Sequence, residues 1–420
     1  MKVLRERRLD DLAAGRIAVP DEATMAEARR IVDDVRERGL DAVLDHAHRL
    51  GDLQPGERGF WDPGALADER DRLSAAQRDV LERTATRIRA FADAQRGSLH
   101  DLTMAIPGGR VGHTIAPVER AGCYAPGGRF PLPSSVLMTV VTANAAGVAS
   151  VWVASPRPAP VTLAAAAIAG ADGLLAIGGA QAIAALAFGV GPVAPCDVIA
   201  GPGNRWVMAA KQLVAGRLGV DLVAGPSELV VVADAGADPD TVASDLLAQA
   251  EHDPDAIPVL VTTDRCLARD VDRAICTQLD ALATAVTARA ALANGGVVLV
   301  SSREEAVEAC NRLAPEHLEL VVEDAQALVP ALRHYGALFI GAGAGEVLGD
   351  YGAGPNHVLP TGGAARFSGG LSVFTFLRVR TWLAIDEASS ASPLVRDAVA
   401  LARMEGLVAH AASAARRLAG

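Results

Sequence analysis

Between about Val118 and Val232, charged residues become scarce and short apolar runs alternate with alanine-rich segments. The runs SVWVAS, GLLAIGG, CDVIAG and ELVVVAD are typical of strands, and the segments between them are typical of helices. Alternation of this kind indicates parallel βαβ units with right-handed crossovers. This part of the chain is therefore predicted to form an α/β lobe around a parallel sheet.

A second block with the same alternation begins at SELVVVAD. The stretch DPDTVASDLLAQAEHD is typical of a helix, with Asp238 as its N-cap and Pro239 as its first residue. Strands are expected at PVLVTTD, GGVVLVSS, LELVVED and ALFIG, and a helix is expected through EEAVEACNRL. The two blocks predict two doubly wound lobes, although no residue-level repeat links them.

The two ends of the chain differ from this middle part. The sequence is charged and helical up to about Gln95, with Ser74 placed as a helix N-cap, and it turns helical again after about Leu371. Gly406 divides that tail into a helix ending near Glu405 and a helix carrying His410. Both terminal segments are too small to fold alone, so we expect them to pack on the lobes or on a second subunit.

Composition excludes several classes of protein. The net charge is −11 over 420 residues with no basic run, which would repel a nucleic-acid backbone. The most apolar region, 161–191, is interrupted by Asp172 and Gln181, which favours buried helices and a strand over a membrane span. The start of the chain has no continuous apolar stretch that could act as a signal peptide. We therefore expect a cytoplasmic protein that binds neither nucleic acid nor a membrane.

The cysteines indicate a reducing compartment. They are odd in number, widely spaced and without a CxxC pair: Cys123, Cys196, Cys266, Cys276 and Cys310. This pattern argues against a disulfide framework and against a thiolate zinc site. Cys123 lies in the glycine-rich stretch AGCYAPGG, but its sequence neighbours supply no base, so we interpret it as a packing residue rather than a nucleophile.

Gln249 and His252, in the stretch LLAQAEHDPDA, lie on the same face of the expected helix. The following Asp253-Pro254 ends that helix, so the pair stands at its C-terminal end. His252 could bind a metal, but glutamine is an unusual zinc ligand and two ligands do not make a site. The residues alone leave two hypotheses open: a solvated helix end, or half of a metal site with remote partners.

Two further stretches carry acid and base side chains. In APEHLEL, Glu316 and His317 are adjacent, and such a pair can divide the activation of water from the movement of substrate protons. The Gly- and Pro-rich stretch GDYGAGPNHVLPTGGAAR must form a shaped loop, on which Asp350 and His357 are candidate ligands or bases. A plain helix-to-strand connection and a surface loop are the alternative interpretations.

The glycine turns offer no standard nucleotide-binding motif. IAGPGNRW follows an expected strand and opens a helix, so Gly201 and Gly203 would let backbone amides approach a phosphate. It is not GxGxxG, because Trp206 fills the third glycine position, and GAGAGE at 341–346 fails the same test. There is no P-loop either. A dinucleotide would have to bind by a different arrangement.

The order of these motifs is more specific than any one of them. The chain resembles the histidinol dehydrogenase family over about residues 115–412, through AGCYAPGGRFPLPSSVLM, GGAQAIAAL, GPGNRWVMAAK, AGPSELVVVAD, LLAQAEHD, APEHLEL, GDYGAGPNHVLPTGGAARFSGGLSVFTFL and EGLVAHA. Departures are few: Trp206 stands where Tyr or Phe is common in that family, and FTF at 374–376 varies from other members.

The resemblance implies an α/β fold with two incomplete Rossmann-like parallel-sheet lobes and small helical extensions at both ends. We expect an N-terminal extension at 1–20 and one lobe formed by 21–121 and 229–372, which carries most zinc-site and catalytic residues. The other lobe, 122–228, would bind NAD. The tail, 373–420, would cross to the neighbouring subunit of a homodimer and complete that subunit's site.

The resemblance also implies a reaction: oxidation of L-histidinol to L-histidine through the bound aldehyde, with two NAD⁺ reduced, in the last two steps of histidine biosynthesis. One Zn²⁺ per subunit would orient the substrate, with Gln249, His252, Asp350 and His410 as ligands. Glu316 would activate water, and His317 would be the base in both hydride transfers. NAD would contact Tyr124, Gln181 and Asn204. The substrate would contact Ser227, Gln249, His252, His317, Asp350, Glu405 and His410.

Two other functions are compatible with these residues. A dehydrogenase of the same fold could act on another small polar alcohol, such as a sulfonated diol. Such an enzyme should carry extra cationic side chains near the substrate, and the motifs offer only Arg366 and Arg378. A metal-dependent hydrolase could use the metal with Glu316 and His317 to activate water without a cofactor.

Overall fold

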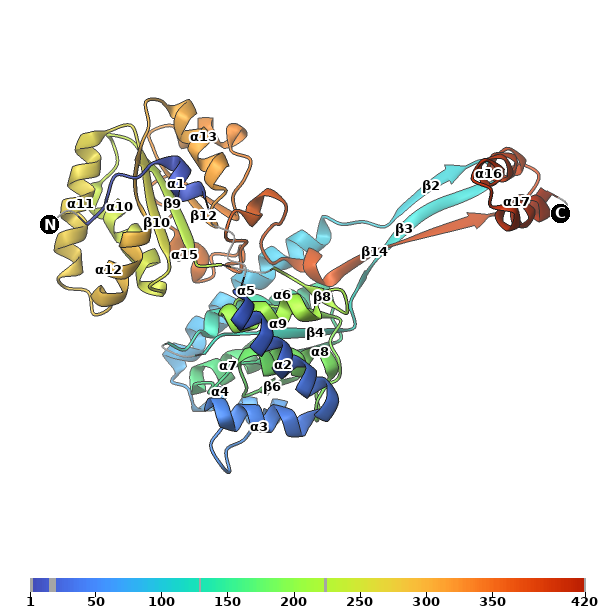
Figure 1. The fold of residues 1–420 in the computed structure, drawn as a ribbon, viewed down its shortest axis with the longest axis horizontal. Coiled ribbons are helices and arrows are strands. Elements are labelled where there is room, and N and C mark those ends of the chain that lie inside the picture. Colours follow the sequence, from blue (N-terminus) through green and yellow to red (C-terminus); the bar gives the residue numbers. More distant parts are fainter. Residues whose placement is uncertain (1–2, 15–19, 128–129, 223–224, 419–420) are drawn as a thin grey trace.

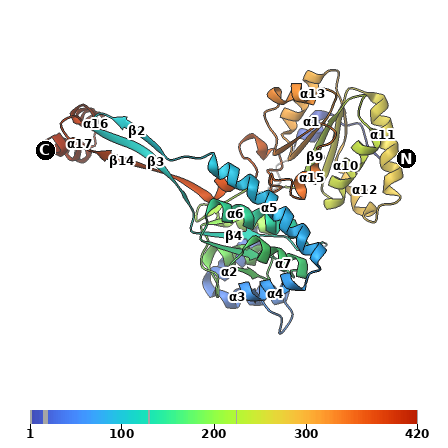
Figure 2. The ribbon, with the colours of Figure 1, turned by 180° about the vertical axis from the view of Figure 1, so that it is seen from behind.

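The computed structural model describes residues 3–14, 20–127, 130–222 and 225–418. It has two α/β lobes and a long arm that projects away from them and carries the C-terminus at its far end (Figure 1, Figure 2). Each lobe is built on a parallel or mainly parallel sheet, as the alternating pattern predicted. Among the described residues, no helix combines the length and apolar character that crossing a membrane requires.

Lobe 1 contains the sheet β1-β6-β5-β4-β7-β8. Its strands are β1 (Phe60–Trp61), β4 (Arg120–Tyr124), β5 (Ser150–Ala154), β6 (Gly173–Leu175), β7 (Val198–Ala200) and β8 (Gly219–Val220). Only β1 pairs antiparallel, with β6. The strands are connected by α6 (Pro133–Ala146), α7 (Pro160–Ala169), α8 (Gly179–Phe188) and α9 (Arg205–Val214). The strand order reverses between β4 and β7, and folds of this type bind ligands beside the carboxyl ends of the strands at such a point.

Local sequence explains where several of these helices begin and end. Both α6 and α7 begin at a proline, whose fixed φ suits the first helical position. Each ends before a glycine in the left-handed conformation, Gly147 or Gly170. Cys123 is fully buried in β4, in agreement with its interpretation as a packing residue.

The first helices of the chain also belong to lobe 1. They are α2 (Glu22–Arg38), α3 (Leu40–Leu50), α4 (Pro63–Arg72) and α5 (Ala75–Gly97), which begins at the predicted Ser74 cap. α2 packs on α8 and α9, α4 on α7, and α5 on α6, and their apolar faces share one core with the strands. The assignment of 21–121 to the same lobe as 229–372 is therefore wrong, because both faces of the lobe 1 sheet need a helical cover and these helices supply it.

Lobe 2 contains the all-parallel sheet β11-β10-β9-β12-β13. Its strands are β9 (Glu228–Ala233), β10 (Ile257–Thr262), β11 (Gly296–Leu299), β12 (His317–Val321) and β13 (Ala337–Ile340). Its helices are α10 (Pro239–His252), α11 (Arg265–Leu279), α12 (Ala285–Asn294), α13 (Arg303–Leu313), α14 (Ala325–Leu328) and α15 (Glu346–Asp350). Asp238 caps α10 and Pro239 begins it, as predicted. In chain order, the parallel strands of the two sheets follow the same 3-2-1-4-5 arrangement.

Residues 3–14 pack on lobe 2 rather than on lobe 1. They include the short helix α1 (Leu9–Ala13), which contacts α13. Leu4 and Leu12 are buried in the two apolar clusters of lobe 2. The expected N-terminal extension is thus held by burial of a few apolar side chains.

The arm is a three-stranded antiparallel sheet that ends in two helices. It contains β2 (Leu102–Ile106), β3 (Gly109–Pro117), β14 (Leu377–Ile385), α16 (Ser392–Met404) and α17 (Val408–Ala415). The expectation of helix alone after Leu371 is wrong for β14, which pairs with β3 over all nine of its residues. The break at Gly406 is confirmed, since α16 ends at Met404 and α17 begins at Val408.

Candidate functional site

Acid, amide and imidazole side chains gather at the edge of lobe 2 where its strands begin. Ser227 immediately precedes β9, and His317 is the first residue of β12. α10 connects the end of β9 to the start of β10, so its C-terminal end lies at this same edge and brings Gln249 and His252 there. α15 contributes Asp350. The fold therefore brings together side chains that are far apart in the sequence.

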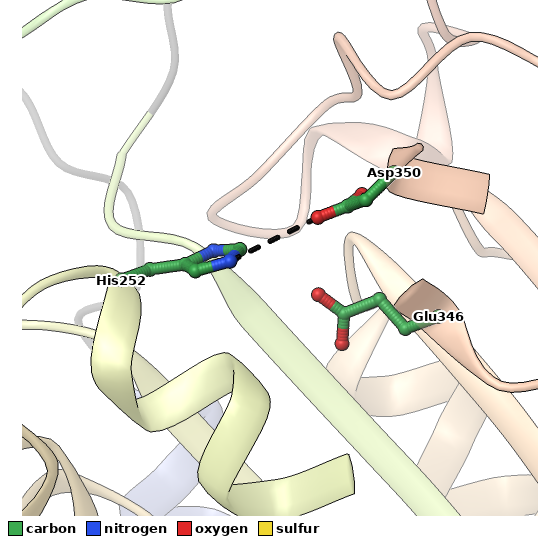
Figure 3. A group of neighbouring side chains, drawn as sticks. All are labelled: His252, Glu346 and Asp350. Carbon is green, nitrogen blue, oxygen red and sulfur yellow. Dashed lines mark ion pairs between the residues drawn. The ribbon is translucent and has the colours of Figure 1, made fainter. Parts of the chain in front are cut away.

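His252, Glu346 and Asp350 form the cluster drawn in Figure 3, in which each residue offers a ligand atom within 4.8 Å of the others. His252 Nε2 lies 3.9 Å from Asp350 Oδ2. Gln249 is fully buried, and its amide nitrogen donates to the two carboxylate oxygens of Glu346 at 3.0 and 3.2 Å. We assign this amide orientation because it sets the amide nitrogen, which donates, against two acceptor oxygens, and it turns the amide oxygen away from Glu346.

Glu346 was not among the residues singled out in the sequence. It lies one helical turn before Asp350 on α15, and it is 3% exposed. Burial raises the pKa of its carboxyl well above the usual range. The sequence did offer one sign of Glu346: it stands four positions before Asp350, and residues at this spacing share one face of a helix.

His317 is surrounded by acidic groups. Its Nδ1 is 3.1 Å from the backbone oxygen of Glu228 and is assigned as the donor in that bond. Its Nε2 is buried, has no hydrogen-bond partner among the described residues, and lies 3.6 Å from Asp350 Oδ1. Burial by itself would lower the pKa of His317, but carboxylates of Glu346, Glu316 and Asp350 raise it well above its usual value.

Glu316 lies on the opposite side of the His317 ring from Asp350. Its Oε2 is 3.6 Å from His317 Nδ1 and accepts a hydrogen bond from the backbone N–H of Glu228 at 2.9 Å. Burial raises the pKa of Glu316 to about 8. The two adjacent residues therefore offer two separate groups that can accept a proton: the Glu316 carboxyl, near Nδ1 of the ring, and His317 Nε2.

A buried carboxyl pair, Asp245 and Glu319, lies behind this cluster. Asp245 is one turn before Gln249 on α10, and Glu319 is two residues after His317 on β12. Burial raises the pKa of both, and the two carboxyls hydrogen-bond to each other. Glu319 Oε1 also accepts the backbone N–H of Glu346 at 2.5 Å. The pair thus ties the start of α15 to α10 and β12.

The residues expected to contact NAD lie on lobe 1, at the carboxyl ends of its strands. Tyr124 ends β4, Gln181 lies in the first turn of α8 after β6, and Asn204 caps α9 after β7. The Tyr124 hydroxyl accepts the backbone N–H of Gly179 at 3.2 Å, which links the loops that follow β4 and β6. Burial raises the pKa of Tyr124 to about 12, so this hydroxyl keeps its proton at neutral pH.

The two lobes meet between these two groups of residues. His357, from the glycine-rich loop, contacts the backbone oxygen of Asp350 through Nδ1 at 2.9 Å. Its Nε2 lies 3.4 Å from the hydroxyl of Ser135 in the first turn of α6. The carboxyl edge of the lobe 1 sheet therefore faces the lobe 2 cluster across a His–Ser contact.

Two of the expected site residues are not brought to the cluster within this chain. Glu405 follows α16 and His410 lies in α17, both exposed at the far end of the arm (Figure 1). The other expected metal ligands, Gln249, His252 and Asp350, do meet at the edge of lobe 2.

Known proteins match the chain over nearly its whole length. Residues 16–418 match the sequence model of the family described as histidinol dehydrogenase. A histidinol dehydrogenase from Thermus thermophilus is 47% identical over 92% of this chain and 92% of its own length. One from Pseudomonas fluorescens is 42% identical over 98% of this chain and 94% of its own length. The crystal structure of a histidinol dehydrogenase from Elizabethkingia anophelis covers 100% of this chain and 98% of its own, with a TM-score of 0.93 and 28% identity.

Proposed function

The chain belongs to the histidinol dehydrogenase family, an NAD-dependent oxidoreductase family, and from this premise we propose that it oxidises L-histidinol to L-histidine with two NAD⁺ and one Zn²⁺ per subunit. The observation that carries the proposal is the position of His317 Nε2. This nitrogen is buried, has no hydrogen-bond partner among the described residues, and lies beside the cluster of His252, Glu346 and Asp350. A base and a set of metal ligands therefore share one site.

The residues present fit a divalent metal. The set combines one imidazole with carboxylate oxygens, a mixture that Zn²⁺ accepts. The orientation of Gln249 supports this, because its amide nitrogen is held by Glu346 and its oxygen is left for another partner. We propose Gln249, His252, Asp350 and the partner's His410 as ligands. When bound, the ion would act as a Lewis acid that orients the imidazole and amine of the substrate.

His317 performs the proton transfers in this proposal. In the first oxidation, His317 Nε2 accepts the alcohol proton, and NAD⁺, when bound, would take the carbon-bound hydrogen as hydride, which gives the aldehyde and NADH. The Nδ1–H bond to the Glu228 backbone oxygen holds the ring so that Nε2 faces the substrate. The nearby carboxylates favour the protonated imidazole that results.

Glu316 performs a different task in the second oxidation. Its carboxylate takes a proton from water, and the resulting hydroxide adds to the aldehyde carbon to give the hydrate anion. Once His317 has released its first proton to solvent, its Nε2 can accept the remaining hydroxyl proton. A second NAD⁺, when bound, would take the second hydride, so that the product is the carboxylate. The hydrogen bond from the Glu228 N–H fixes the Glu316 carboxyl for this role.

The arm supports a homodimer in which each site is completed by its neighbour. Val379, Leu383, Met404 and Val408 are each more than 60% exposed on the arm. Apolar side chains at this density on one projecting element are typical of an interface. We propose that α17 of the partner subunit supplies its His410 to the cluster and that the partner's Glu405 contacts the substrate.

The substrate assignment is tested by comparing alcohols. The purified protein should form NADH with L-histidinol and not with a sulfonated diol, because the site is lined with carboxylates that suit a cationic amino alcohol. NADH formation is followed by absorbance. Turnover of the sulfonated diol alone would assign the chain to another dehydrogenase of the same fold. Water-dependent cleavage of a substrate without any NADH would favour the hydrolase.

A further inference from the structure

Asp52 is a buried carboxylate in lobe 1 with no part in the chemistry described above. It follows α3, whose end is fixed by Gly51 in the left-handed conformation, and its own backbone N–H donates to the Ala47 oxygen at 2.8 Å. Only 9% of the residue is exposed. The backbone thus places this side chain firmly, although it lies 129 positions before its principal partner, Gln181.

Asp52 determines which end of the Gln181 amide faces it. Asp52 Oδ2 accepts from Gln181 Nε2 at 2.9 Å and from the backbone N–H of Gly178 at 2.9 Å. Asp52 Oδ2 already accepts a backbone N–H, so it acts as an acceptor; the amide nitrogen of Gln181 must therefore face Asp52 and the amide oxygen must face away. The reverse orientation would set two acceptors against each other.

The amide oxygen of Gln181 is left without a partner by this arrangement. Gln181 is 1% exposed, and its Oε1 has no hydrogen bond within the described part of the chain. This atom lies in the first turn of α8, beside Gly179, where a Cβ would come within 3.0 Å of it. Buried acceptors in proteins are normally hydrogen-bonded, so this unpartnered oxygen is a place where a ligand can donate a hydrogen bond.

Two backbone N–H groups at the beginning of α8 are already bonded within the protein. The backbone N–H of Gly178 is bonded to Asp52, and that of Gly179 is bonded to the Tyr124 hydroxyl. A phosphate at this helix start would lose both donors and would face the Asp52 carboxylate. The ligand group that meets Gln181 must therefore be a hydrogen-bond donor and not an anion.

We propose that Asp52 is a positioning residue of the cofactor site, which fixes Gln181 so that its amide oxygen accepts a hydrogen bond from an N–H or O–H group of NAD. This inference rests on the proposed function, since it takes Gln181 as a contact of NAD. Three groups of the cofactor carry such donors: the nicotinamide carboxamide, the adenine amino group and the ribose hydroxyls.

The first test compares Asp52→Leu with Asp52→Asn. Leucine removes the acceptor, so Gln181 loses its fixed orientation and the KM for NAD should rise about tenfold, as expected when the cofactor loses one hydrogen bond. Asparagine presents an oxygen in the same place, so it should restore KM to within about twofold of the wild type. The KM for L-histidinol should be unchanged in both. Asp41→Leu, an exposed carboxylate on the same helix α3, is the matched control.

A second test shows whether Asp52 acts through Gln181. In a Gln181→Leu background, Asp52→Leu should raise the KM for NAD no further, because the amide that it positions is gone. A full additional tenfold rise there would overturn the inference. If Asp52→Leu does not fold, Asp52→Ala takes its place in the same comparison. If the wild type is active and the Asp52 variants have its KM for NAD, the positioning role of Asp52 is wrong but the proposed function stands. If the wild type is inactive with histidinol, the proposed function itself is refuted.

Cofactor analogues distinguish the three donors. The 3-acetylpyridine analogue lacks the carboxamide N–H, the hypoxanthine analogue lacks the adenine amino group, and deoxyribose analogues lack single hydroxyls. For the wild type, kcat/KM with one of these analogues should be about tenfold lower than kcat/KM with NAD. Asp52→Leu should lose that difference. Equal discrimination by wild type and variant against every analogue would overturn the proposal.

Discussion

At the scale of single residues, Glu316 and His317 are neighbours in the sequence, but the fold gives their side chains different surroundings. His317 Nδ1 is held by a backbone oxygen, while Nε2 remains without a partner among the described residues. Glu316 is held by a backbone N–H, and burial raises the pKa of its carboxyl to about 8. We propose that this difference separates proton transfer from the activation of water.

The separation predicts how Glu316→Gln should behave. The oxidation of the aldehyde should slow on the order of a hundredfold, because the amide cannot take a proton from water, whereas oxidation of the alcohol should slow far less. In the wild type the carboxyl is protonated below its pKa of about 8 and can accept only above it, so the aldehyde step should accelerate as pH rises through about 8. Single-turnover assays of each half-reaction across this range provide the measurement.

A matched control is Glu323→Gln, an exposed glutamate just beyond the other end of β12. It should leave both steps and the pH profile unchanged. Equal slowing of the two oxidations by Glu316→Gln, or a rise near pH 8 that survives the substitution, would argue against the role proposed for Glu316.

Sequence patterns identified some of these residues and not others. Gln249, His252, Glu316, His317 and Asp350 all stand in short motifs, and the fold does bring them to one edge of lobe 2. Other buried acids, Asp52, Glu319 and Glu346, are not among the residues that the motifs single out. Each has its partner on a different secondary-structure element, and a carboxyl in an ordinary helix or strand pattern gives no sign that the fold will bury it.

At the scale of secondary-structure elements, β14 is the clearest difference from expectation. Its residues LRVRTWLAI alternate in a way that suits a strand, but they lie in the tail after about Leu371, for which the sequence predicts helix. Most of them remain exposed, so no buried face marked the segment as a strand. The pairing with β3, more than 250 positions earlier, is a tertiary effect that local sequence could not show.

The arm also leads to a prediction about how the sites are assembled. If α17 crosses to the neighbouring subunit, His252→Asn and His410→Asn should each be nearly inactive alone, since each loses a metal ligand. Co-expression with two affinity tags would yield hybrid dimers that hold one intact site of two. Hybrids purified through both tags should then have about half of wild-type activity. The measurement is the activity of doubly purified hybrids; hybrids as inactive as either parent would show that each tail serves its own subunit.

At the scale of the whole molecule, the two lobes share a strand order but use opposite edges of their sheets. The proposed NAD contacts lie where the strands of lobe 1 end, and the acid–base cluster lies where the strands of lobe 2 begin. The alternating pattern was sufficient to predict two parallel sheets. The sequence pattern could not assign the first helices to a lobe. An amphipathic pattern reveals that a helix has an apolar face, but it does not reveal which sheet that face covers.

We propose that this site joins a metal, a base and NAD to carry one substrate through two oxidations. The most direct measurement is the number of NADH molecules formed per L-histidinol consumed, before and after removal of metal with a chelator. Two NADH per histidinol, lost on chelation and restored by Zn²⁺, is the result we expect. One NADH per histidinol with release of the aldehyde, or full turnover by metal-free protein, would contradict the account.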